Sequence, residues 1–223
     1  MMMKSELIER KWRKFLFKVK LFKFVPFVDF VVAAGSLVVG GMNENSDFDV
    51  IVGVKSGRIF TVRFFSALTF GILGWRRSKI DHGVDTKDKI CLSHFVTQAS
   101  YKLAPPYNEY WKTMYSNLVP IMGDREKIDE FFKANDWLSS PRTYSEGEMA
   151  KNELHIKYNK SFKSNFWKFI LSGSIGDWLE KRLKAAQVKR IEAGAKDIEP
   201  NKRRLIYTDE LLEFHTYDKP VIR

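Results

Sequence analysis

The sequence predicts an α+β fold: a small mixed β-sheet with flanking helices, followed by a mostly helical C-terminal region. Two observations support this prediction. In residues 1–104, apolar runs rich in β-branched and aromatic residues alternate with segments of helical periodicity. After the Pro105-Pro106 pair, apolar residues recur mostly at helical spacing. We therefore expect two parts, residues 1–104 and residues 105–223.

Residues 5–24 are predicted to form a basic amphipathic helix. Ser5 suits the N-cap, apolar residues follow at helical spacing, and Pro26 ends the segment. Basic residues, Lys11 among them, cover much of the remaining surface. Such a helix packs its apolar stripe on its own domain or lies on an anionic membrane. Stacking of its aromatic residues on single-stranded nucleic acid is a further alternative.

Three strands are predicted, at residues 27–34, 47–54 and 89–96. Gly35-Ser36 ends the first strand, and residues 37–42 suit a short helix. A long apolar helix over residues 58–75 leads towards the third strand, which gives the order of a layered α/β structure.

The C-terminal part is predicted to contain four helices, at residues 107–117, 126–135, 145–160 and 172–193. Residues 205–207 suit a short strand. The basic residues 202–204 fit either phosphate contacts or a solvated charge cluster.

The chain carries a formal net charge of +11, from 38 basic and 27 acidic residues. This excess favours polyanionic partners such as nucleic acid, nucleotides or an anionic membrane surface, although a solvated basic surface accounts for it equally well. Cys91 is the single cysteine, so an intramolecular disulfide is excluded, and we expect it to be a small buried apolar residue. We expect no secretory signal, no stable membrane insertion and a cytoplasmic location.

The segment from Gly35 to Asp49 contains the clearest candidate for a functional site. Gly35 and Ser36 end a strand, where backbone N–H groups and a hydroxyl can donate to a phosphate. Asp47 and Asp49 alternate along the next strand, so both carboxylates leave on the same face. Carboxylates held so closely repel each other unless a cation lies between them, and Mg²⁺ or Mn²⁺ suits such oxygen ligands. We therefore expect a phosphate cradle beside a metal site.

This segment resembles the signature of the DNA polymerase beta-like nucleotidyltransferase superfamily. The matching residues are Ala34, Gly35, Ser36, Asp47, Phe48, Asp49 and Val50, with ten residues between the Gly-Ser pair and the first aspartate. The resemblance covers roughly residues 28–96 and implies a nucleotidyltransferase core in the sheet. It further implies that Gly35 and Ser36 bind the nucleotide phosphates. Asp47 and Asp49 would then be the catalytic residues that bind the metal.

The resemblance implies a metal-dependent transfer of a nucleoside monophosphate from a nucleoside triphosphate to an unidentified acceptor. The positive charge favours an anionic acceptor such as RNA. Members of the superfamily usually carry a third carboxylate on a later strand, but residues 89–96 contain no acid. Asp88, Asp81 and Asp85 are the nearby candidates.

Two other functions stay open. One, favoured by the missing strand acid, is a catalytically weakened protein of the same fold that binds a nucleotide or nucleic acid. The other is a peripheral membrane protein anchored by residues 5–24.

Overall fold

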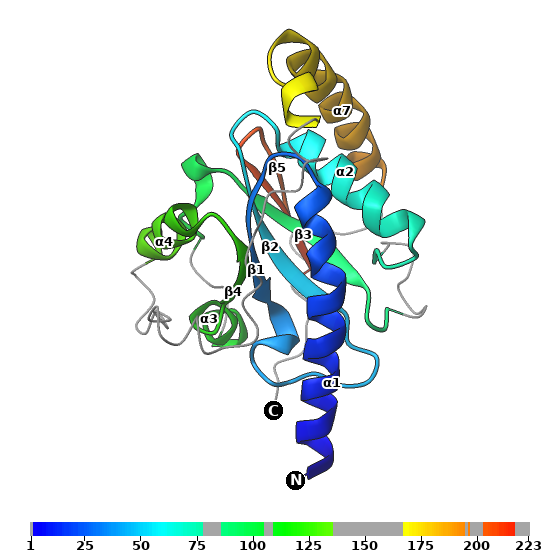
Figure 1. Cartoon of the computed structure of the whole chain (residues 1–223), viewed down its shortest axis with the longest axis vertical. Helices are drawn as coiled ribbons and strands as arrows, with labels where there is room; N and C mark the ends of the chain where they lie inside the picture. The colour runs from blue at the N-terminus through cyan, green and yellow to red at the C-terminus, as the bar shows by residue number, and fades with distance from the viewer. Residues whose placement is uncertain are drawn as a thin grey trace.

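The computed structural model describes residues 2–77, 86–104, 109–135, 167–194, 196 and 203–216. The strands in this part of the chain form one mixed sheet with the order β4-β1-β2-β3-β6-β5 (Figure 1). β2 and β3 are parallel, and the other neighbouring pairs are antiparallel. The strands are β1 (Val28–Ala34), β2 (Phe48–Val54), β3 (Ile90–Val96), β4 (Val119–Gly123), β5 (Arg203–Tyr207) and β6 (Leu211–Thr216).

The three strands expected near the N-terminus are confirmed as β1, β2 and β3, each within about a residue of its predicted bounds. β1 and β2 are buried along almost their whole length. Continuous burial of this kind belongs to central strands that are covered on both faces, and it explains their unbroken apolar runs.

The C-terminal region holds more strand than predicted, because β4, β5 and β6 all come from residues after 105, and β5 includes the short strand predicted at residues 205–207. β4 pairs with β1 at one edge of the sheet and includes Pro120, which an edge strand tolerates. β5 and β6 form a hairpin that pairs with β3 at the other edge. The sheet therefore crosses the predicted boundary between residues 104 and 105.

The described helices are α1 (Met2–Val19), α2 (Ile59–Ile72), α3 (Glu109–Ser116), α4 (Arg125–Ala134) and α7 (Ser174–Ala193). They confirm five of the predicted helices, although residues 20–24 form a 3-10 helix rather than the end of α1. The helix predicted at 145–160 lies outside the described residues. Among the described residues, no helix combines the length and apolarity needed to cross a bilayer.

Residues of β1 and β2 alternate between two apolar clusters on opposite faces of the sheet. Val50 and Val52 pack with residues of α1 and α2 on one face. Phe30 and Ile51 pack with residues of α3 and α4 on the other face. Asp49 alternates with Val50, so its carboxylate leaves the sheet on the side of α3 and α4.

α7 packs along α2 and caps its N-terminus. The Glu180 carboxylate accepts hydrogen bonds from the backbone N–H groups of Phe60 and Thr61, both at 2.8 Å. The side chain of the preceding residue, Arg58, does not cap this end of the helix. A carboxylate at a helix N-terminus satisfies unpaired N–H donors and interacts favourably with the helix dipole.

Lys11 of α1 is buried, with 1% of its surface exposed, which corrects its predicted place on the charged outer surface. Its ammonium donates to the backbone carbonyls of Glu44 and Ser46 at 2.7 and 3.0 Å. The same Nζ lies 2.8 Å from Asp88 Oδ1. These contacts compensate for the loss of hydration of a buried charge. They tie α1 to the loop before Asp47 and to the turn before β3.

Replacing Lys11 tests this bridge. Lys11→Met keeps an unbranched apolar stem but removes the ammonium, so two carbonyls and Asp88 lose a partner. We expect urea denaturation to show a loss of roughly 3 kcal/mol in the free energy of unfolding. Lys20→Met, an exposed lysine just after α1, is the matched control and should change stability by less than about 0.5 kcal/mol. Equal effects of the two substitutions would contradict a bridging role for Lys11.

Candidate functional site

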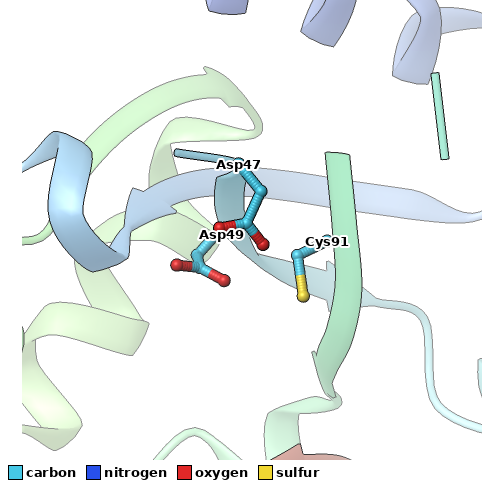
Figure 2. A group of neighbouring side chains, drawn as sticks. All are labelled: Asp47, Asp49 and Cys91. Carbon is cyan, nitrogen blue, oxygen red and sulfur yellow. The ribbon is translucent and has the colours of Figure 1, made fainter. Parts of the chain in front are cut away.

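The structure brings Asp47, Asp49 and Cys91 together at the start of β2 and β3. Asp47 directly precedes β2, Asp49 is its second residue, and Cys91 pairs with Asp49 across the parallel β2–β3 register. One potential ligand atom from each of the three side chains lies within 4.8 Å of the others. Figure 2 shows the two carboxylates and the thiol gathered in one region. Asp47 and Asp49 therefore have the shared face that their alternation predicts.

Gly35 lies directly against Asp49. β1 ends at Ala34, which pairs with Asp49, and Gly35 then turns with a φ of +71°. A Cβ atom at Gly35 would stand 2.0 Å from Asp49 Oδ2, which no real side chain allows. Both the positive φ and the close approach thus require glycine here.

Ser36 follows in a short 3-10 helix, Gly35–Leu37, and its carbonyl accepts a hydrogen bond from Gly41 N at 3.1 Å. The helix expected at residues 37–42 does not form, because the chain turns instead and Gly40 takes a φ of +71°. A full helix dipole therefore does not point at this site. Any phosphate contact would come from individual N–H groups and from the half-exposed Ser36 hydroxyl.

The loop before Asp47 is fixed by its own polar side chains. Asn43 Oδ1 accepts from Asn45 N, and Ser46 Oγ accepts from Asn43 N, both at 2.9 Å. The Ser46 carbonyl also accepts from Asp88 N at 3.2 Å. These turn contacts set the direction in which the chain enters β2.

Arg77 is also part of the site, although it was not among the site residues predicted from the sequence. Its guanidinium donates to Asp47 Oδ2 and lies 4.0 Å from Cys91 Sγ. Burial disfavours the charge of Arg77, but Cys91, Asp47 and Asp49 outweigh that effect and raise its pKa above the ordinary value. Arg77 therefore supplies positive charge to the acidic pair, and a metal ion would compete with it for Asp47.

Cys91 was also missed as a site residue. The resemblance implies a third carboxylate on a later strand, but the residue that β3 places beside the two aspartates is a cysteine. Burial, followed by the charges of Asp49 and Asp47, raises the pKa of the Cys91 thiol to about 12. At neutral pH the thiol is therefore protonated and uncharged.

The other proposed sources of a third carboxylate do not join this group in the described residues. Both oxygens of Asp88 face lysines of α1, with Lys11 Nζ at 2.8 Å and Lys14 Nζ at 2.5 Å. Burial alone would raise the pKa of Asp88, but the hydrogen bonds and charges of Lys11 and Lys14 hold it below its ordinary value. Asp81 and Asp85 lie outside the described residues.

Of the three side chains, the carboxylates of Asp47 and Asp49 fit a divalent cation such as Mg²⁺, and the thiol of Cys91 does not. Two carboxylates are ligands that Mg²⁺ and Mn²⁺ accept, with water and phosphate oxygens completing the shell. A neutral thiol is a poor ligand for these hard ions, because sulfur suits softer metals. Asp47 and Asp49 are therefore the residues that could hold Mg²⁺ or Mn²⁺, with Cys91 as a neighbour.

Two glycines with the same φ give a matched test of the close approach at Asp49. Gly35→Ala introduces both backbone strain and a collision with the carboxylate, whereas Gly40→Ala introduces strain alone, because nothing lies within 4 Å of its added Cβ. We expect Gly40→Ala to cost about 1 kcal/mol of stability and Gly35→Ala about 2–4 kcal/mol. Urea denaturation of both variants measures this difference, and equal losses would mean that Gly35 and Asp49 are not in contact.

Comparisons of the chain with models of protein families, with curated proteins and with solved structures gave no match in any of the three. The function is therefore inferred from the sequence signature and from the geometry of the site.

Proposed function

We propose that this protein is a metal-dependent nucleotidyltransferase, which transfers a nucleoside monophosphate from a nucleoside triphosphate to an acceptor. The observation that carries the proposal is the contact between the Gly35 turn and the Asp49 carboxylate, with Asp47 alongside. A glycine turn next to paired carboxylates suits the phosphate and cation contacts that phosphoryl transfer requires.

In this proposal Asp47 and Asp49 would hold Mg²⁺ or Mn²⁺, and Gly35 and Ser36 would contact the triphosphate. The bound metal would neutralise phosphate charge. An acceptor oxygen forms a bond to the α-phosphorus. At the same time the bond breaks between that phosphorus and the oxygen that bridges the α- and β-phosphates. Pyrophosphate leaves with the electron pair, and the proton of the acceptor hydroxyl passes to solvent or a base. The formal net charge of +11 favours an anionic acceptor such as RNA.

Arg77 has a role that the geometry suggests. Its guanidinium pairs with Asp47 in the structure described here. With Asp47 holding a cation, Arg77 would lose that partner and could contact the triphosphate instead. A guanidinium forms strong hydrogen bonds with phosphate oxygens. Arg77 would thus exchange a carboxylate for the nucleotide.

A second candidate function is nucleotide binding without efficient transfer. It is favoured by Cys91, which stands beside the two aspartates and cannot act as a base while its thiol stays protonated. Without a general base, the gain expected from proton removal, about 10²–10⁴-fold in rate, is lost.

Labelled nucleotides test the proposal. The purified protein would be incubated with each nucleoside triphosphate labelled at the α-phosphate, with Mg²⁺ or Mn²⁺ and with RNA or the protein itself as acceptor. We expect pyrophosphate release and transfer of label, and a loss of about 10²-fold or more in Asp49→Asn, because a carboxylate ligand is removed. Asp129→Asn, an exposed aspartate on α4, is the control and should keep full activity.

Each outcome of this assay separates the candidates. Metal-dependent nucleotide binding without any transfer, lost in Asp49→Asn, would favour the weakened binding protein. Transfer that persists at the wild-type rate in Asp49→Asn would place the chemistry elsewhere and refute the site.

A further inference from the structure

α2 is apolar all round, although only part of it faces the core. Its sequence, IFTVRFFSALTFGI, contains a single charged residue, Arg63. The guanidinium of Arg63 lies against the Phe214 ring of β6, 5.0 Å from the ring centre. A helix at the surface of a globular protein normally carries polar and charged residues on its outer side. The composition of α2 is therefore typical of a helix that is covered on its outer side as well.

Three large apolar side chains follow the outer side of α2. Phe64, Leu68 and Ile72 are spaced four residues apart, so they lie on one face of the helix. Their exposed fractions are 39%, 45% and 76%. At a rise of about 1.5 Å per residue, this outer stripe is about 12 Å long. Single exposed apolar residues are ordinary, but a continuous exposed stripe marks a surface that binds a partner or a membrane.

Aromatic contacts continue the apolar surface beyond both ends of the outer stripe. Near the start of α2, the rings of Phe64 and Phe65 lie 5.5 Å apart. Phe65 in turn lies 6.1 Å from the exposed Trp167. Just after α2, the ring of Trp75 lies 5.7 Å from Phe17, an exposed residue of α1. The outer stripe therefore belongs to a larger apolar surface that includes residues of three segments.

Lysines border this surface. Lys18 Nζ lies 5.2 Å from the centre of the Trp75 ring. Lys20 and Lys23 are exposed on the 3-10 helix that follows α1 and contacts α2. Within the residues that the structure describes, no carboxylate lies at ion-pair distance from either of these two lysines. Apolar side chains flanked by lysines suit the boundary between lipid headgroups and acyl chains.

The charge around the outer stripe selects among its possible occupants. Residues 10–28 and 58–77 contain lysines and arginines but no aspartate or glutamate. A second copy of the chain would bring like charges together, which disfavours a dimer through this face. An anionic lipid surface attracts these charges and takes up apolar side chains without a shaped pocket. The lipid surface is therefore the occupant that the charges favour.

The structure also moves the membrane alternative from α1 to α2. The sequence suggested the apolar side of α1 as an anchor, but Phe15 and Val19 on that side are fully buried. They belong to the apolar cluster that α1 and α2 share with the sheet. The apolar side of α1 is thus used inside the protein, whereas the outer stripe of α2 is exposed.

We propose that the outer stripe of α2, together with Phe17, Lys20 and Lys23, binds the surface of an anionic membrane. The apolar side chains enter the headgroup region, and the lysines contact the anionic headgroups. The Asp49 carboxylate leaves the sheet on the opposite face, so the candidate site points away from the lipid. This proposal does not depend on the proposed nucleotidyltransferase activity.

Co-sedimentation of the full chain with lipid vesicles tests the apolar part of this surface. The vesicles contain phosphatidylcholine alone or with roughly 30% phosphatidylserine. We expect binding to the phosphatidylserine vesicles only, and weaker binding at high salt. Leu68→Gln with Ile72→Gln should weaken it by about tenfold or more, because the burial of two apolar side chains is lost. Leu68→Met with Ile72→Met keeps the surface apolar and should stay within about threefold of the wild type.

Two pairs of lysines separate a local surface from general attraction. Lys20→Gln with Lys23→Gln and Lys112→Gln with Lys133→Gln change the net charge equally. The second pair is exposed on α3 and α4, which cover the other face of the sheet. Only the first pair should weaken vesicle binding by about tenfold or more, because lysines act strongly only within a Debye length of about 10 Å from the lipid.

Circular dichroism establishes that the variants fold, which we expect because all the substituted side chains are exposed. No binding to phosphatidylserine vesicles, or unchanged binding by Leu68→Gln with Ile72→Gln, would overturn the proposal. Equal weakening by the two lysine pairs would do the same. Sedimentation equilibrium gives the remaining outcome: a dimer that dissociates in Leu68→Gln with Ile72→Gln would assign the outer stripe to a second copy of the chain instead.

Discussion

The buried ammonium of Lys11 is the contact on which the geometry of the candidate site depends. Its acceptors lie in two segments that are distant in sequence: the loop ending at Ser46 and the turn at Asp88. These segments lead into the parallel strands β2 and β3. Because a buried charge is costly without partners, α1 can pack only when both segments are in place. The start of β2, with Asp47 and Asp49, is thereby aligned with Cys91 on β3.

The sheet has different surroundings on its two faces. On the side of α3 and α4, the paired carboxylates are balanced by Arg77 and lie against the Gly35 turn. On the side of α1 and α2, Val50 and Val52 of β2 pack into the apolar cluster. Alternation along β2 therefore places Asp49 and these core residues on opposite faces of the sheet.

The sequence predicted the features that depend on local patterns. The central strands have unbroken apolar runs, and the positions of Gly35, Asp47 and Asp49 follow from a strand end and a two-residue period. Contacts between distant segments were not predictable. Nothing near Lys11 marks it as buried, and Cys91 joins the aspartates only through strand pairing. β4 was missed because its proline argues against a strand unless the strand is known to lie at an edge.

The most direct test of the account is an electron paramagnetic resonance titration of Mn²⁺ with the wild-type protein and with Asp49→Asn, each with and without a nucleoside triphosphate. The account predicts that the wild type removes free Mn²⁺ signal at one or two ions per chain, that the triphosphate strengthens this binding, and that Asp49→Asn loses it. Unaltered Mn²⁺ binding in Asp49→Asn, or no binding in the wild type even with a triphosphate, would contradict the claim that this carboxylate pair is a metal–nucleotide site.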